Sequence, residues 1–101
     1  MKFAVLVAAF AIQLSAAADT VKLNQYRSLD DCKNDRNILF HAAPISGTCY
    51  NIDSQTRGIF FNTGGFLSSR FYRNAGCNGE SIGVSGAACI IRDEWNSFRL
   101  S

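Results

Sequence analysis

Cysteine is the residue that most constrains this chain, because Cys32, Cys49, Cys77 and Cys89 all follow an apolar N-terminal segment. An even number of cysteines in a short chain with a secretory start predicts disulfides. Structural zinc is the competing use of cysteine, but the chain has no C-x-x-C pair and His41 is its only histidine. We therefore expect two disulfides, and four cysteines allow three connectivities.

The first 18 residues have the pattern of a secretory signal peptide. Lys2 precedes a nearly uninterrupted apolar run from Phe3 to Leu14, and an Ala-Ala-Ala end at 16–18 follows. The run is about a dozen residues, shorter than the roughly 20 that span a bilayer. We expect cleavage after Ala18, a single mature domain over residues 19–101, extracellular localisation and no transmembrane segment.

Length, composition and charge exclude several classes of protein. A chain of 101 residues is one domain in size, and 48% hydrophobic residues exclude a disordered tail. The formal net charge of +2 includes Lys2, so the mature chain is close to neutral. Nucleic-acid-binding domains carry a marked Lys/Arg excess, so we expect no nucleic-acid partner.

Short β-forming runs separated by turn residues dominate the mature chain. They predict an all-β sandwich or barrel of about eight strands. The polar segment 30–36 is the exception, and it is compatible with a long loop or with one helical turn. The expected strands are Val21–Arg27, Ile38–His41, Cys49–Ile52, Gly58–Asn62, Leu67–Arg73, Ser81–Val84, Cys89–Arg92 and Trp95–Leu100.

The mature chain also repeats itself, over residues 21–62 and 67–101. In each half an aromatic residue precedes the first cysteine by six positions, and a Ser-Gly pair precedes the second cysteine. This order indicates a duplicated supersecondary unit. Duplication favours disulfides within each half, Cys32–Cys49 and Cys77–Cys89, over the other two connectivities.

The second half resembles a βγ-crystallin motif. Tyr72 is followed after six positions by Gly79, and an acidic-polar stretch leads into a last strand that contains Ser97. In this family the aromatic ring packs over a folded hairpin, and the glycine adopts a backbone angle that a side chain would forbid. The first half departs from the pattern, because Lys33 stands where the glycine would be.

The resemblance implies two four-stranded Greek-key motifs packed as a small sandwich, which agrees with about eight strands. With its leader and cysteines, the chain is also similar to small secreted fungal proteins of the effector and killer-toxin type, and to some protease inhibitors.

The resemblance also implies a possible calcium site at Asp93, Glu94 and Ser97, although Phe98 replaces the last serine of the family pattern. Calcium takes six to eight oxygen ligands, and this segment supplies few. The alternative is a solvated turn before the last strand. We expect no other cofactor.

Catalysis has little support in the sequence. A cysteine nucleophile needs a free thiolate, and no G-x-S-x-G elbow presents a serine. We expect a non-enzymatic binding protein that meets a protein, glycan or lipid outside the cell, with Trp95, Arg73 and Arg99 as possible contact residues. The alternatives are a calcium-stabilised structural or storage protein and a protease inhibitor that presents loop 62–66 or loop 41–47.

Overall fold

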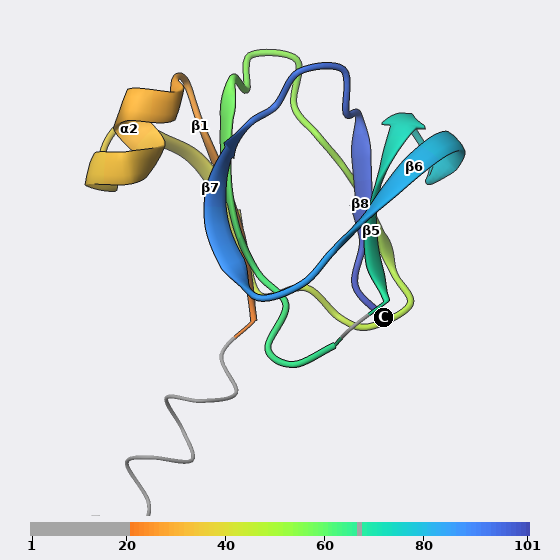
Figure 1. Ribbon diagram of the computed structural model, residues 1–101. Coiled ribbons are helices and arrows are strands. Elements are labelled where there is room, and N and C mark those ends of the chain that lie inside the picture. Colours follow the sequence, from red (N-terminus) through yellow and green to blue (C-terminus); the bar gives the residue numbers. More distant parts are fainter. Residues whose placement is uncertain (1–20, 67) are drawn as a thin grey trace, which may run out of the picture.

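Two antiparallel four-stranded sheets face each other, and one short helix lies beside them (Figure 1). The computed structural model describes residues 21–66 and 68–101, so the expected leader lies outside the described residues. The helix α2 spans Leu29–Asn34. The strands are β1 (Lys22–Tyr26), β2 (Ile38–Ala42), β3 (Cys49–Asn51), β4 (Gly58–Asn62), β5 (Ser69–Asn74), β6 (Asn78–Val84), β7 (Ala87–Ile91) and β8 (Ser97–Arg99). The prediction of an all-β fold with about eight strands and two disulfides is confirmed.

Each half of the chain places its third strand in the sheet of the other half. One sheet, sheet A, has the order β2-β1-β4-β7, and the other, sheet B, has the order β3-β8-β5-β6. Strand β7 pairs with β4, with Ile91 opposite Gly58, and β3 pairs with β8, with Cys49 opposite Arg99. Each sheet therefore contains three strands of one half and one strand of the other, which interlocks the halves.

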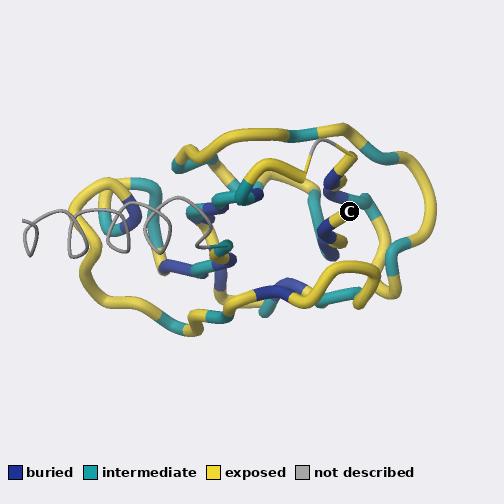
Figure 2. The backbone as a smooth tube through the Cα atoms, turned by 90° about the horizontal axis from the view of Figure 1, so that it is seen from below, coloured by how far each residue is buried: buried dark blue, intermediate teal, exposed yellow. Residues whose placement is uncertain are grey.

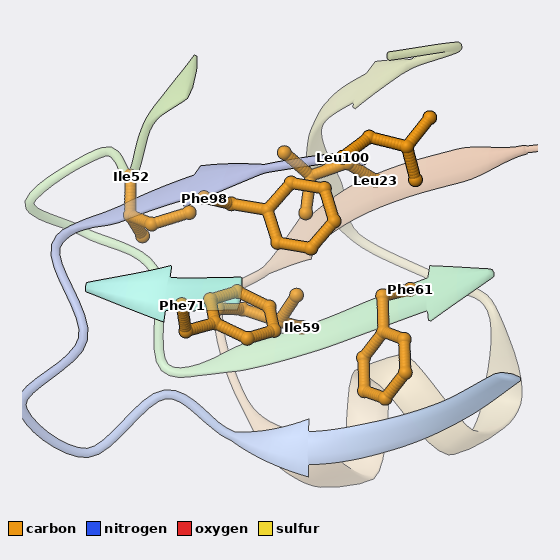
Figure 3. Close-up of a cluster of buried hydrophobic side chains, with 7 residues drawn as sticks. All are labelled: Leu23, Ile52, Ile59, Phe61, Phe71, Phe98 and Leu100. Carbon is orange, nitrogen blue, oxygen red and sulfur yellow. The ribbon is translucent and has the colours of Figure 1, made fainter. Parts of the chain in front are cut away.

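The space between the sheets is filled by aromatic and aliphatic side chains from both layers (Figure 3). The ring of Phe71 lies 4.8 Å from that of Phe98 and 5.8 Å from that of Phe61, which belongs to the opposite sheet. Burial of each phenylalanine contributes about 2–3 kcal/mol. Buried positions within strands lie in β1, β4, β5 and β8, and Figure 2 shows exposed positions along much of the remaining chain. The core cluster consists of Leu23, Ile52, Ile59, Phe61, Phe71, Phe98 and Leu100.

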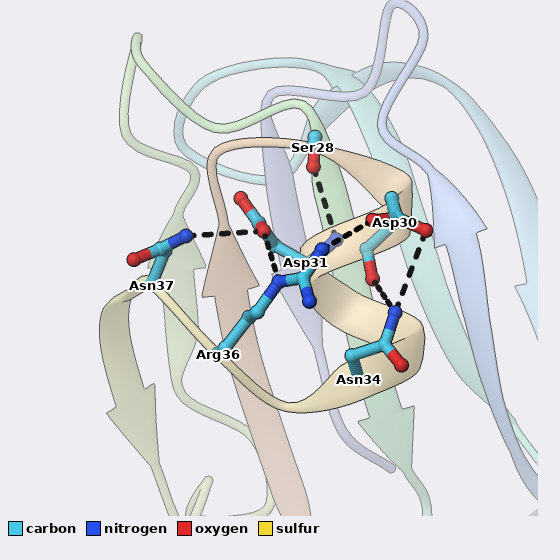
Figure 4. A network of polar contacts seen from close by, with 6 residues as sticks. All are labelled: Ser28, Asp30, Asp31, Asn34, Arg36 and Asn37. Carbon is cyan, nitrogen blue, oxygen red and sulfur yellow. Dashed lines mark hydrogen bonds and ion pairs between the residues drawn. The ribbon is translucent and has the colours of Figure 1, made fainter.

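The polar segment 30–36, which the sequence left open between a long loop and a helical turn, lies mostly in helix α2. The Ser28 hydroxyl accepts a hydrogen bond from the Asp31 backbone N–H at 3.0 Å, which caps the first turn. The Arg36 guanidinium forms ion pairs with Asp30 and Asp31, and the Asn37 side-chain amide donates to Asp31 Oδ1 at 3.2 Å (Figure 4). The helix is therefore held by its own polar side chains at the surface.

A glycine and a disulfide attach α2 to the outer face of sheet A. A Cβ at Gly58 would lie 2.4 Å from the Ser28 carbonyl oxygen, so only glycine permits this approach. Cys32 of α2 is bonded to Cys89 of β7. The helix thus lies across strands from both halves of the chain. Among the described residues no helix is long and apolar enough to cross a membrane.

The predicted disulfide pairing within halves is wrong, because the observed bonds are Cys32–Cys89 and Cys49–Cys77. The reason is the exchange of third strands. Cys89 lies in sheet A, within reach of Cys32, and Cys49 lies in sheet B, within reach of Cys77. The two bonds occupy equivalent positions in the two halves, so the internal repeat agrees with them once the exchange is taken into account.

Candidate binding site

The residues of the crystallin-like motif form the folded hairpin between β5 and β6. The Ser97 hydroxyl donates to the Asn74 carbonyl oxygen at 2.6 Å and accepts from the Cys77 backbone N–H at 2.9 Å. Ser97 is fully buried although it lies on the outer face of sheet B, since the hairpin covers it. Gly79 has φ +80°, and a Cβ there would lie 2.6 Å from Asn74 Nδ2. Tyr72 pairs with Ser97 in the sheet, so the three motif residues lie together.

The proposed contact residues Arg73 and Trp95 lie next to each other. The Arg73 guanidinium lies 5.7 Å from the centre of the Trp95 ring, within cation–π range. Arg73 also forms ion pairs with Glu80 and Glu94. Trp95 is half-buried and packs against the core, and the Arg73 guanidinium lies over its ring.

Arg99 lies apart from that pair, on the outer face of sheet B. It stands opposite Arg70 and Cys49 in the sheet, and its exposed side chain forms no hydrogen bond or ion pair with the described residues. The three proposed contact residues therefore do not form one surface.

The residues of the possible calcium site are already engaged in part. The Ser97 hydroxyl holds the hairpin, and the Glu94 carboxylate pairs with Arg73. Asp93 is exposed and has a left-handed backbone, with φ +53°. No group of three His, Cys, Asp or Glu side chains in the described residues gathers at one point.

The two loops proposed for protease inhibition each contain a turn, at residues 46–47 and at residues 64–65. In loop 41–47 the Ile45 side chain is 67% exposed, but the Ile45 carbonyl oxygen accepts from the Thr48 N–H at 3.1 Å. In loop 62–66 Gly64 and Gly65 have positive φ values of 59° and 95°.

A cleft between α2 and the end of β7 gathers cationic and apolar side chains, and we name it the α2–β7 cleft. It has a volume of about 460 Å³ and is lined by Arg27, Ser28, Leu29, Arg57, Ile91, Arg92 and Asp93. Volumes in the range of about 300–1,000 Å³ are typical of small-molecule sites. Of these residues the sequence pointed only to Asp93, as part of the possible calcium site. The exchange of β7 brings Ile91 to the same cleft as Leu29, and it leaves no local signal in the sequence.

Arg92 organises the wall of this cleft. Its guanidinium donates to the carbonyl oxygens of Asp53 and Thr56 at 3.0 and 3.2 Å, and to that of Trp95 at 2.9 Å. It thereby ties together the loops that follow β3 and β7. Burial lowers the pKa of Arg92, the nearby charge of Arg57 lowers it further, and the charge of Asp53 acts in the opposite direction. The cleft therefore holds positive charges that repel each other.

A second hollow, of about 430 Å³, lies between β2 and the segment 50–53. Phe40, 52% exposed, and His41 line it. At its floor the Gln25 side-chain oxygen accepts from the Asp53 N–H and from the Thr56 hydroxyl, both at 2.8 Å. Since this polar group is satisfied by the protein itself, the α2–β7 cleft is the better candidate for ligand binding.

Comparison with known proteins found no matching family model, no matching curated protein and no matching solved structure.

Proposed function

We propose that this chain is a small secreted binding protein that acts without catalysis on a molecule outside the producing cell. A fungal effector or a toxin-like protein fits this description. The observation that carries the proposal is the α2–β7 cleft, in which Arg27 and Arg57 have no carboxylate partner among the described residues and Ile91 is 61% exposed. Such a surface offers charge and apolar area to a partner.

The two disulfides support a function outside the cell. All four cysteines are paired, so none is available as a thiolate nucleophile. The bonds close chain segments of 57 and 28 residues, and each joins the two halves of the chain. Crosslinks of this kind are found in small proteins that work in oxidising compartments.

We propose a fold similar to that of the βγ-crystallins for the scaffold that carries the cleft. The folded β5–β6 hairpin, the positive φ of Gly79 and the buried Ser97 hydroxyl support it in the second half. In the first half α2 occupies the place of the hairpin, and Lys33, which departs from the motif, lies in that helix. We propose two Greek-key units, the first of which has a helix in place of the folded hairpin.

Exposure of living cells to the oxidised chain Asp19–Ser101 tests this function. Plant tissue and competing microbes are treated side by side, and the reduced, alkylated protein is the control. We expect damage or a defence response that requires intact disulfides. Equal effects of oxidised and reduced protein, or inertness toward both kinds of cell, would count against the proposal.

A further inference from the structure

The apolar part of the α2–β7 cleft is built on Gly58. Ile91 stands directly opposite Gly58 in the sheet, and a Cβ at Gly58 would lie 2.9 Å from the Leu29 Cα. Leu29 and Ile91 therefore flank the same glycine, one from the helix above the sheet and one from the edge strand. The Cys32–Cys89 bond joins the same two elements and holds the walls of the cleft at a fixed separation.

The polar part of the cleft carries three arginines and one carboxylate. Arg27 donates to the Gln55 side-chain oxygen at 2.8 Å, and Arg57 donates to the Ser54 and Thr56 carbonyl oxygens at 3.0 Å. The four ion pairs of the described residues involve Arg36 and Arg73, so the arginines of the cleft have none. Asp93 lines the cleft but pairs with none of them.

The guanidinium groups of Arg27 and Arg57 keep N–H donors that no described residue accepts, whereas Arg92 donates from all three of its nitrogens. A guanidinium has five donors in a planar fork that matches a carboxylate. Arg27 and Arg57 each use one nitrogen, Nη1, on a neutral oxygen of the segment 54–56. A carboxylate at the cleft would therefore find free donors and would relieve the repulsion between Arg57 and Arg92.

We infer that the α2–β7 cleft binds a monomeric amphiphile that has a carboxylate head group and a short hydrocarbon tail. The head group lies against Arg27 and Arg57, and the tail covers Leu29 and Ile91. This inference rests on the proposed binding function and gives its ligand a chemical class.

The surroundings of the cleft favour a single molecule over a membrane. Interfacial binding to a bilayer needs a continuous apolar face that enters the lipid. The other exposed large hydrophobic residues of the described chain lie on other elements, in β2, in the loops after β2 and β4, and in β6; they are Ile38, Phe40, Ile45, Phe66 and Ile82. Ile91 alone of this group lies at the cleft.

Titration of the oxidised protein with sodium decanoate, below its micellar concentration, tests the inference by calorimetry and amide NMR. We expect saturable binding, with shifts that centre on Leu29, Arg57 and Ile91. Decanol, which lacks the charge, and acetate, which lacks the tail, should each bind at least about tenfold more weakly. No saturable binding of decanoate, or equal binding of decanol, would overturn the inference.

Matched variants separate the cleft from the general surface. Arg57→Gln should weaken decanoate binding about tenfold, whereas Arg99→Gln removes the same charge elsewhere and should change it by less than about twofold. Ile91→Ala should weaken binding about fivefold, and Ile45→Ala, at another exposed isoleucine, should not. Equal effects within either pair would overturn the assignment to this cleft.

Binding to vesicles of phosphatidylglycerol is measured as the third part of the experiment. Binding to these vesicles without binding to decanoate monomers would replace the inference with membrane adsorption. A protein that acts on cells but does not bind decanoate would refute the ligand class and leave the proposed function standing. A protein that binds decanoate through Arg57 but is inert on cells would refute the proposed function instead.

Discussion

Cys32, in the only helix of the described residues, is bonded to Cys89, in a strand that belongs to the other half of the chain but lies in sheet A, against which the helix packs. In the same way, Cys77 of the second half is bonded to Cys49, whose strand β3 belongs to the first half but lies in sheet B. The third strand of each half is therefore held in the foreign sheet by hydrogen bonds along its length and by one covalent bond.

Removal of either disulfide should destabilise the protein strongly. For bonds that close 57 and 28 residues, the loss of chain entropy predicts about 4 kcal/mol for the double variant Cys32→Ala/Cys89→Ala and about 3.5 kcal/mol for Cys49→Ala/Cys77→Ala. Urea denaturation of both variants under oxidising conditions measures these losses. Losses below about 1 kcal/mol in both would show that the bonds do not hold the exchanged strands.

Ser97→Ala should cost about 2 kcal/mol of unfolding free energy. The substitution leaves the Cys77 N–H and the Asn74 carbonyl oxygen without their shared buried partner. Ser85→Ala, at an exposed serine, is the control and should stay within about 0.5 kcal/mol of the parent. If the two variants unfold at the same urea concentration, the hairpin is not held by Ser97.

Gly58→Ala should release helix α2 from the sheet. The new methyl group would meet the Ser28 carbonyl oxygen at 2.4 Å, and we expect a loss of about 2 kcal/mol with faster amide exchange in α2. Gly83→Ala places the same methyl group in a strand where its nearest neighbour, Arg70 Nη1, lies 3.5 Å away. Unchanged exchange in α2 of the Gly58 variant would contradict the described packing.

The carboxylate of Asp31 should make the stability of the protein depend on acid pH. Desolvation raises the pKa of Asp31, but hydrogen bonds from Arg36 and Asn37 outweigh it and hold the pKa below its usual range. The contribution to stability is therefore complete above about pH 4 and is lost as the pH falls through the folded pKa.

Denaturation of the parent and of Asp31→Asn between pH 7 and pH 2 measures this dependence. The difference in unfolding free energy between the two proteins should shrink as the pH falls below about 4. Asp93→Asn, at an exposed carboxylate that forms no ion pair with the described residues, is the control. A constant difference over the whole pH range would show that Asp31 does not contribute to the pH dependence of stability.

Local pattern was sufficient to predict the strands, because alternating β-formers between turn residues report directly on pleated structure. Phe98 and Leu100 alternate with exposed Arg99 at the end of the chain, and both are buried. The last strand begins later than expected, at Ser97, since the Trp95 N–H donates to the Arg92 carbonyl oxygen in a turn.

Long-range pairing was not predictable in the same way. A repeat in the sequence favours bonds inside each repeat, and nothing near Cys89 reveals that β7 crosses to the other sheet. The α2–β7 cleft depends on the same crossing, because it brings Ile91 beside Gly58 and Leu29. Helix α2 had a readable local signal, the Ser28 cap three residues before Asp31, but the helix is too short for hydrophobic periodicity.

The most direct test of the central claim measures the response of target cells to three oxidised proteins, the parent, Arg57→Gln and Arg99→Gln. If the protein acts by binding through the α2–β7 cleft, the parent and Arg99→Gln should give the same response, and Arg57→Gln should need about tenfold more protein. Equal potency of all three folded proteins would contradict the claim.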